Sequence, residues 1–566
     1  MTKRFVLALH ILILAVVGLQ AENPVSVPLH DPVYSFLERM ETLGYAHNVF
    51  NGIKPFSRSQ VADYLKQIAE HRSELTSIDR RRLDDFLLDY RWEINPKRRN
   101  ALLPKDKNWY SILASWQNFK KDFKRFFKQR YPEEQNHVFL WETDSSNFYF
   151  DYEQGADYEK RSDDIYRSAS WQQYRFRGVL NRNFGFHFEV SLEGFRGNNE
   201  TYIQQHPRLK GSWSETSDYK VHYSDRTVGE LAFHSRYFDL HFAQQPVSWG
   251  YGESGKLILS DNSEPYPYLS ISKNWKWFKF IAMHGKLQSF PQDTLKDGYI
   301  YYPDKWLAAH RLELTVGHKL TLGFNECFIY GERYADWAYL LPFNFYRAVQ
   351  HKLRDRDNAT ISIDAEWLVR PGLKTYGTLF LDEFRRKKIG TNWYGNKQAF
   401  SAGIWWVDPF KIPNFSLRFE YTAIMPWVYT HKYRINSYTS DYRSIGHWAG
   451  PNSEVYFFHL RKDWHARLET GFKFRQWKHG ANYPNENIGG DILLGHGTLL
   501  GTQQKPRETR KFLEGILSTQ RLFQLYANYE IFNGFYLKGA ITFDRLKVEN
   551  TENSYREYFV GAVLKY

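Results

Sequence analysis

Most of the chain alternates apolar and polar residues with a period of two. Between Phe415 and Ala423, the odd positions are Phe, Leu, Phe, Tyr and Ala, and the even positions are Ser, Arg, Glu and Thr. The same alternation recurs in 466–475, in 535–544 and in many other stretches after about residue 136. Successive side chains of a β-strand point to opposite faces, so this period predicts strands.

Short turns separate several of the predicted strands. Turn residues stand at 181–183, 317–319, 370–372 and 461–464. Strands that follow one another through short turns form an antiparallel meander, and roughly 16 to 20 strand candidates suit a transmembrane barrel. One face of many strands carries charges and the other carries aliphatic and aromatic residues. This favours a barrel with a wet lumen over a soluble sandwich.

The region before the strands has a helical period instead. Apolar residues recur at helical spacing across 31–90, with start signals at Asp31-Pro32, Ser57 and Thr76. They predict a small bundle of three short helices. A basic and aromatic stretch follows, "FKKDFKRFFKQR" at 119–130. It predicts either a basic amphipathic helix at a membrane surface or a solvated linker helix that packs on its neighbours.

The first residues have the pattern of an export signal. Lys3 and Arg4 precede an apolar run, and Ala21 offers a small residue for cleavage. This predicts a secretory signal peptide, with a single anchor helix as the alternative. We therefore expect a signal peptide at 1–21, a periplasmic helical bundle at 22–95, a basic amphipathic linker at 96–135 and an outer-membrane β-barrel at 136–566.

The composition limits the classes of molecule that the protein could bind. The chain has 566 residues, a net charge of +13, 18% aromatic residues and a mean hydropathy of −0.61. This hydropathy argues against a bundle of membrane helices. The positive charge suits nucleic acid, anionic lipid or an acidic polysaccharide, and export makes nucleic acid improbable. Cys327 is the sole cysteine, so no intramolecular disulfide can form.

Two details concern the strand pattern itself. The chain ends in "YREYFVGAVLKY", with a terminal aromatic residue on the apolar face. This end resembles the C-terminal assembly signal of bacterial outer-membrane barrels, so we expect the barrel assembly machinery and outer-membrane lipids as partners. Glu326 breaks the alternation, because it falls on the face of Leu322, Phe324 and Phe328. Either it lies near an interface or a bulge, or the assumed phase is wrong there.

Specific catalytic motifs are missing from the sequence. It contains no H-E-x-x-H, no G-x-S-x-G and no phosphate-binding glycine loop. We therefore expect no enzyme activity, no cofactor and no metal site. The stretch "RDRDN" at 354–358 could contact an ionic ligand or form a self-neutralising cluster of ion pairs.

The stretch "PVSWGYGESGKLILSDNSEPYP" at 246–267 combines aromatic rings, turn residues and amides. It resembles the W-G-x-G…L-I-L-S-x-N-A-x-P-x-P segment of the capsule assembly Wzi family. A second block, 308–367, resembles that family's strand hairpin, its Y-L-x-P motif (here 339–342) and its D-N run (here 357–358). The chain departs from the family pattern at Ser263-Glu264 and at 254–256.

The resemblance implies an 18-stranded outer-membrane barrel with a periplasmic helical bundle. It also implies a lectin-like role, in which the protein binds or anchors capsular or other surface polysaccharide and supports capsule assembly. Sugar rings stack on Trp and Tyr, and amides and carboxylates bind hydroxyl groups. A basic chain would attract an acidic capsule.

The residues that fit these sugar contacts lie in the two resembling blocks. We expect them to include Trp249, Tyr251, Asn262 and Tyr266, with Arg354, Arg356 and Asp357 as weaker candidates. The alternative is an inward-folded loop whose rings simply fill the barrel. Two competing functions stay open, a porin-like channel and, less favoured, an outer-membrane hydrolase.

Overall fold

The computed structural model of the protein describes residues 22–128, 135–209, 215–216, 221–296, 299–353, 356–383, 385–388, 390–495 and 507–566. The expected signal peptide at 1–21 lies outside the described residues, and so does Arg354. No helix in the described part of the chain is long and apolar enough to cross a membrane.

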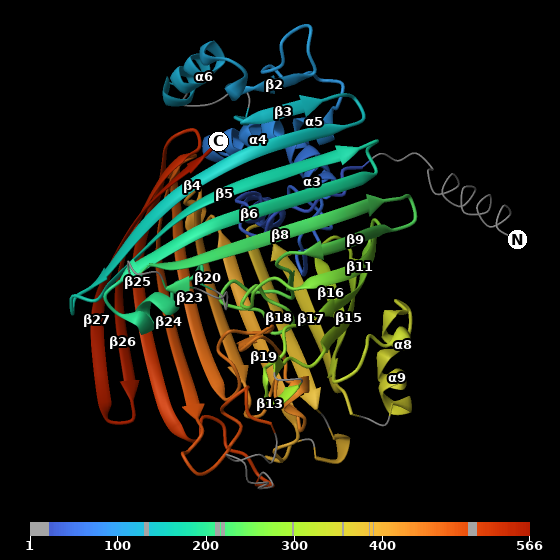
Figure 1. The fold of residues 1–566 in the computed structure, drawn as a ribbon, viewed down its shortest axis with the longest axis vertical. Coiled ribbons are helices and arrows are strands. Elements are labelled where there is room, and N and C mark those ends of the chain that lie inside the picture. Colours follow the sequence, from blue (N-terminus) through green and yellow to red (C-terminus); the bar gives the residue numbers. More distant parts are fainter. Residues whose placement is uncertain are drawn as a thin grey trace, which may run out of the picture.

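Within these residues, eighteen antiparallel strands close into a barrel (Figure 1). Closure occurs where the last strand, β27 (Thr551–Lys565), pairs with the first, β4 (Asn147–Arg161). Each wall strand therefore has a partner on both sides, and the predicted meander and barrel are confirmed. The strands between these two are β5 (Tyr166–Leu180), β6 (Phe184–Gly197), β8 (His222–His234), β9 (Asp239–Gln244), β11 (Pro267–Asn274), β12 (Phe278–Lys286), β15 (Lys305–Val316), β16 (Leu320–Gly331), β17 (Asn358–Arg370), β18 (Leu373–Glu383), β19 (Lys397–Val407), β20 (Phe415–Ile424), β23 (Ser453–His465), β24 (Leu468–Ala481), β25 (Ile516–Phe532) and β26 (Phe535–Val548).

The two faces of the wall reverse the usual relation between polarity and burial. In β20, the exposed fraction is 46% for Phe419 but only 3% for Glu420 and 7% for Arg418. In the last strand, Val560 likewise faces outward and is 56% exposed. An apolar outer face and a charged lumen are the arrangement of a barrel that spans a membrane.

The two ends of the barrel differ in the length of their connections. At one end, which we call the turn end, neighbouring strands join through short turns, including those predicted at 181–183, 317–319 and 370–372. The turn predicted at 461–464 is wrong: these residues belong to β23, and the chain turns at 466–467. Asp463 stays in the ladder opposite Glu469 and points into the lumen, where it binds arginine side chains. At the other end, the loop end, most connections are long.

A helical domain, residues 22–95, occupies the lumen at the turn end, and we call it the helical plug (Figure 1). Its helices are α2 (Val33–Leu43), α3 (Arg58–Glu70), α4 (Ser77–Asp89) and α5 (Arg91–Ile94). At two of the predicted starts, Ser57 forms a capping box with Gln60, and the Thr76 side chain caps α4. Gly44 ends α2 with a φ of 90°, a conformation that favours glycine. The apolar faces of these helices form their own core.

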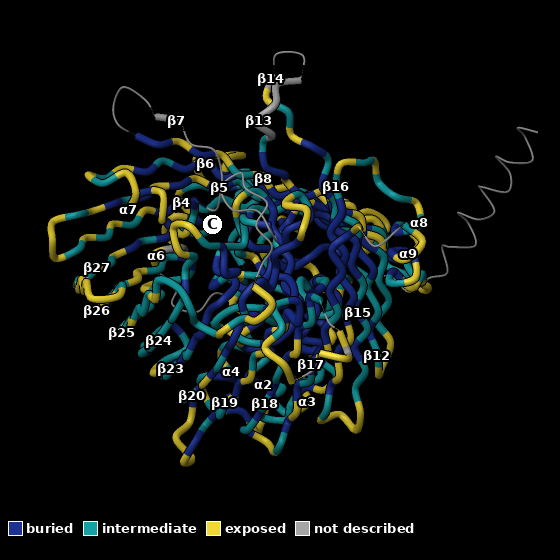
Figure 2. The backbone as a smooth tube through the Cα atoms, turned by 90° about the horizontal axis from the view of Figure 1, so that it is seen from below, coloured by how far each residue is buried: buried dark blue, intermediate teal, exposed yellow. Residues whose placement is uncertain are grey.

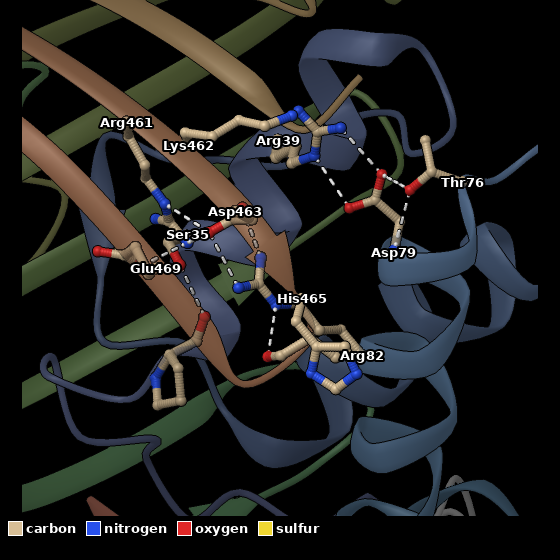
Figure 3. Close-up of polar contacts among 12 residues, drawn as sticks. Ser35, Arg39, Thr76, Asp79, Arg82, Arg461, Lys462, Asp463, His465 and Glu469 are labelled. Atoms are coloured by element: carbon tan, nitrogen blue, oxygen red, sulfur yellow. Dashed lines mark hydrogen bonds and ion pairs between the residues drawn. The ribbon is translucent and has the colours of Figure 1, made fainter. Parts of the chain in front are cut away.

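Ion pairs join the helical plug to the barrel wall (Figure 3). Arg82 of α4 donates two hydrogen bonds to the Asp463 carboxylate, at 2.7 and 3.0 Å. Arg39 of α2 binds Asp79 within the plug and Asp408 in a turn of the wall, each through two hydrogen bonds. Paired arginine–carboxylate contacts of this kind fix orientation as well as distance.

The remaining elements lie between or beyond the wall strands. α6 (Trp116–Lys128) covers most of the basic stretch and lies at the turn end, where Phe127 contacts Phe532 of β25 at 5.0 Å between ring centroids. β2 (Trp109–Ser111) and β3 (Phe139–Glu142) extend the sheet beside β4. The other short elements are β1 (Ile53–Lys54), β7 (Glu215–Thr216), β10 (Ser248–Trp249), β13 (Gln292–Lys296), β14 (Tyr299–Tyr301), β21 (Thr439–Ser440), β22 (Arg443–Ser444), α7 (Glu200–Gln204), α8 (Trp337–Leu340) and α9 (Tyr346–Lys352).

Candidate functional site

The connection between β9 and β11, residues 245–266, contains most of the stretch singled out in the sequence. We call it the inner segment, because it folds into the lumen and meets the helical plug. Its strand β10 pairs with β1, with Trp249 opposite Ile53. The next amide, that of Gly250, donates to the Gly52 carbonyl at 2.9 Å. Gly250 has a φ of 99°, so the turn after β10 requires a glycine.

The aromatic rings of the inner segment pack into the largest apolar core of the lumen. Trp249 is completely buried, and it shares this core with Leu257, Ile258, Leu259 and Tyr266. Tyr251 is also buried, and its hydroxyl donates to the Glu313 carboxylate of β15 at 3.3 Å. Figure 2 shows the buried residues gathered inside the ring of strands.

A long connection from the loop end covers the inner segment. This connection, residues 425–452 between β20 and β23, is called the cover loop here. The hydroxyls of Tyr429 and Tyr438 donate to the carbonyls of Leu257 and Ile258, both at 2.8 Å. Asn262 donates its side-chain amide to a cover-loop carbonyl, that of Ser444, at 2.9 Å. The helical plug, the inner segment and the cover loop therefore form three successive layers across the lumen.

Charged wall residues hold the hairpin of the inner segment, residues 249–259, in place. The Glu420 carboxylate accepts hydrogen bonds from the backbone amides of Glu253 and Ser254, at 2.6 and 2.7 Å. Glu253 in turn contacts His459 at 2.9 Å and Arg418 at 3.5 Å.

Two titratable groups of the same hairpin have shifted pKa values. Burial alone would raise the pKa of Glu253, but a hydrogen bond from His459 and the charge of Arg418 hold it well below its usual range. Burial, together with the nearby charge of Lys54, lowers the pKa of Lys256 to about 8. The hairpin is therefore anchored by an ionised carboxylate and carries an amine whose pKa is lower than that of an exposed lysine.

Of the seven residues expected to bind polysaccharide, the six that the structure describes lie in two separate places. Trp249, Tyr251, Asn262 and Tyr266 belong to the inner segment, where their side chains contact the plug, the wall or the cover loop. Arg356 is exposed and Asp357 is buried, next to a different connection, 332–353. Asp357 accepts two hydrogen bonds from Arg333 at 2.8 Å, and Arg354 lies outside the described residues. Their contact with sugar stays a prediction.

A group of rings and cations, most of them exposed, lies at the loop end, and the sequence motifs did not identify it. We call it the rim patch; its members are Phe290, Lys432, Tyr433, Arg434, Tyr442 and Arg443. Tyr433 and Tyr442 are about half exposed. Arg434 lies 4.8 Å from the ring of Phe290, and that ring lies 5.1 Å from the ring of Tyr442. The sequence signal is the alternation of cations and tyrosines in "HKYR" and "DYR".

A cavity of about 440 Å³ separates part of the helical plug from the wall at the turn end. Its lining is strongly charged and includes Arg39, Arg82 and Asp463. Several of its buried polar atoms lack hydrogen-bond partners, among them Nε2 of Gln173 and both ring nitrogens of His187. Such a lining suits water or small hydrophilic solutes rather than apolar ligands. Among the described residues, no group of His, Cys, Asp or Glu side chains could hold a metal ion.

Comparisons with known proteins agree with this architecture. The family described as "Capsule assembly protein Wzi" matches residues 153–557. The chain is similar to the solved structure of Wzi from Escherichia coli, with 12% identity and a TM-score of 0.55, over 95% of this chain and 99% of that one. That protein is described as an outer-membrane protein involved in group 1 capsule assembly and a carbohydrate-binding β-barrel.

Two other solved structures are less similar. OccAB2 of Acinetobacter baumannii has a TM-score of 0.42 and 10% identity, over 74% of this chain and 98% of its own. OprD of Pseudomonas aeruginosa has a TM-score of 0.41 and 10% identity, over 74% and 95%. No curated protein matches the sequence.

Proposed function

The chain belongs to the Wzi family of capsule assembly proteins, and from this premise we propose that it is an outer-membrane protein that binds surface polysaccharide at its loop end. Short turns face the periplasm and long loops face the outside in barrels of the outer membrane, which puts the loop end outside the cell. The protein then holds polysaccharide at the cell surface and supports capsule assembly. We assign it a binding role and no catalytic one.

The observation that carries this proposal is the layered filling of the lumen. Three segments from distant parts of the sequence hydrogen-bond to one another along the barrel axis, through Gly250 with Gly52 and through Tyr438 with Ile258. A lumen filled in this way supports a rigid platform rather than a route for solutes. The porin-like alternative has no comparable support.

The rim patch supplies the chemistry for sugar contact. Tyr433 and Tyr442 expose ring faces, on which the apolar faces of sugar rings can stack. Arg434 and Arg443 add cations, which favour carboxylate-bearing or phosphate-bearing polysaccharides. Most other residues of the cover loop are buried, so the patch needs little ordering when a ligand binds.

The inner-segment residues predicted from the family pattern have a supporting role in this proposal. Trp249, Tyr251 and Tyr266 pack the layer on which the cover loop rests. Direct sugar contact by these rings, or by Asn262, Arg356 and Asp357, remains an alternative that the same experiment addresses.

The test uses purified protein folded in detergent and immobilised acidic polysaccharide from a capsulated strain. We expect Tyr433→Ala/Tyr442→Ala to weaken binding by about tenfold or more, since stacked aromatic contacts contribute about 1 kcal/mol each beyond their area. The bound polysaccharide should be recovered at its original length. Added salt should weaken binding to an acidic polymer, because exposed charge pairs are screened.

The matched control is Trp464→Ala, which removes an exposed ring at the turn end. It should leave binding unchanged. Equal loss in both variants, or no loss in the double variant, would contradict the rim patch as the binding surface. Single-channel recording in planar bilayers tests the alternative function, and steady open-channel currents from the wild-type protein would contradict the platform role.

A further inference from the structure

Glu326 points to the outside of the barrel and is nevertheless completely buried. It pairs across the ladder with His310, and the two side chains meet at 2.8 Å between Nε2 and Oε2. Its neighbours on the same face, Leu322 and Phe324, are about 40% exposed. The assumed phase of this strand was therefore correct. An ionisable pair on a lipid-facing wall is costly, so its cover needs an explanation.

The cover is the connection after β16, residues 332–353, which we call the outer segment. Instead of extending away from the barrel, it folds back along the outside of the wall with its helices α8 and α9 (Figure 1). The ring of Tyr346 stacks on His310 at 4.5 Å between centroids. Tyr339 packs against the outward rings of Phe328 and Tyr330, at 5.6 and 5.1 Å.

A polar clasp closes both ends of this segment. Asp357, just before β17, accepts two hydrogen bonds from Arg333 at 2.8 Å and one from the Tyr339 hydroxyl at 2.9 Å. Gln350 of α9 donates to the Asp357 carbonyl at 2.7 Å. Tyr339 and Asp357 are the first residues of the two motifs that resemble the family pattern. These motifs therefore meet in space and hold the segment against the wall.

The outward side of the clasped segment carries large apolar side chains that contact little protein. Tyr334, Phe343 and Trp337 are 88, 84 and 83% exposed, the highest values among large apolar side chains of the described residues. Phe343 stacks on Phe280, an outward residue of β12, at 5.2 Å. The exposed rings are thus continuous with the lipid-facing surface of the wall.

We propose that the outer segment is a lipid-binding element in the leaflet at the loop end. Acyl chains lie against Trp337, Leu341 and Phe343, where they cover side chains that would otherwise face water. Exposed Lys352 and Arg356 follow where the chain returns to the strand ends, and they bind anionic phosphate groups of the same lipid. This order of apolar rings and then cations matches the order of acyl chains and headgroups in a leaflet. The inference does not depend on polysaccharide binding.

The test places an environment-sensitive fluorophore on Phe343→Cys in the full-length protein, in a Cys327→Ala background. Cys327→Ala removes only the sulfur atom of a buried side chain, and Phe343 is exposed, so neither change disturbs the core greatly. The protein is reconstituted in vesicles of phosphatidylcholine and phosphatidylglycerol. Lipids with nitroxides on their acyl chains should quench this label at least about threefold more than they quench a label on Lys387→Cys, a site exposed at the loop end. Aqueous iodide should show the opposite preference.

Iodide quenching of the Phe343 label equal to that of the Lys387 label would overturn the proposal. Protection of the Phe343 label from both quenchers would also overturn it, in favour of a protein partner or a second copy. A second measurement addresses the cations. Native mass spectrometry should show about tenfold weaker retention of phosphatidylglycerol by Lys352→Glu/Arg356→Glu than by wild type, with phosphatidylcholine retention unchanged. Unchanged phosphatidylglycerol retention would remove the headgroup part of the proposal.

Discussion

The inner and outer segments leave the same end of the barrel and take opposite routes. Both are rich in aromatic residues, and both resemble the family pattern. In the inner segment, every predicted ring is buried against the plug, the wall or the cover loop. In the outer segment, Tyr339 and Tyr346 are buried while Trp337 and Phe343 remain exposed. Aromatic content alone therefore does not distinguish a packing element from a binding surface.

The surface that receives each segment explains the difference. The lumen offers charged side chains such as Glu420 and Arg418, so the inner segment is held by hydrogen bonds to its backbone and by its own apolar core. The outer wall offers apolar rings and the polar pair of His310 and Glu326, so the outer segment is held by ring stacking and by its clasp. The side of the outer segment that does not contact the wall then has the same surroundings as the outer face of the wall.

The largest expected effect comes from removing a buried ring of the inner segment. Trp249→Ala should lower the free energy of unfolding by about 3–5 kcal/mol, because it leaves a cavity in a closed core. Trp337→Ala in the outer segment should lower it by about 1–2 kcal/mol, because the ring loses its contact with acyl chains but leaves no cavity in the protein. Urea unfolding in lipid vesicles, followed by the electrophoretic shift of the folded barrel, measures both. Similar values for the two variants would contradict the comparison.

A smaller effect should follow from loss of the wall anchor for the inner segment. Glu420→Leu leaves the amides of Glu253 and Ser254 without their acceptor, and we expect about 2–4 kcal/mol of destabilisation. Amide hydrogen exchange should increase in 250–256 before it increases in the wall. Glu552→Leu, which removes an ion pair at the loop-end hairpin, is the control and should have almost no effect. Unchanged exchange in 250–256 would show that Glu420 is not the anchor.

Opening the clasp of the outer segment should have a local effect. Asp357→Asn weakens the contacts to Arg333 and Tyr339, which we expect to cost about 1–3 kcal/mol. Limited proteolysis should then cleave within 332–353 faster, while global unfolding in urea stays close to wild type. Asp304→Asn, which affects a half-exposed pair with Lys286, should leave proteolysis unchanged. Equal cleavage rates in the wild type and in Asp357→Asn would contradict the clasp.

The smallest effect concerns pH. The pKa of Glu253 is lower in the folded protein than in the unfolded chain, so its ionised form stabilises the inner segment at neutral pH. That contribution is present above the ordinary pKa of glutamate and is lost as the pH falls toward the lowered folded value. Glu253→Gln should therefore reduce stability by about 1 kcal/mol at pH 7 and flatten its decline in acid. Urea midpoints between pH 7 and pH 3 measure this. A decline as steep as that of wild type would assign the acid sensitivity to other groups.

The period-two pattern was sufficient to predict the barrel because a membrane and a lumen impose opposite demands on alternate residues. The pairs Phe419/Glu420 and Val560/Gly561 follow that rule, and the capping box of α3 follows from Ser57 and Gln60 alone. The failed turn at 461–464 has a physical cause as well. Taken in isolation, the polar residues of "RKDW" predict a turn. In the structure, Asp463 lies in a strand, and its carboxylate forms an ion pair with Arg82 of the plug.

The candidate site was harder to predict. Trp249 and Tyr266 were identified as part of a segment, but the sequence could not tell whether their rings would be covered. That outcome depends on the cover loop, about 180 residues further along the chain, as the bond from Tyr429 to Leu257 illustrates. The rim patch was missed for the same reason, since Phe290 and Tyr442 come together only when two separate connections meet.

The sequence by itself determined the barrel, the helices that precede it and the family, because these depend on local periodicity, capping and short motifs. Only the tertiary structure decided which way each long connection folds, and hence which rings are exposed. The reason is that an aromatic side chain gains from covering any apolar surface, whether it belongs to the lumen, the outer wall or a ligand. For Glu326, the sequence pattern indicated a charge on the apolar face, and only the fold showed that the outer segment shields it.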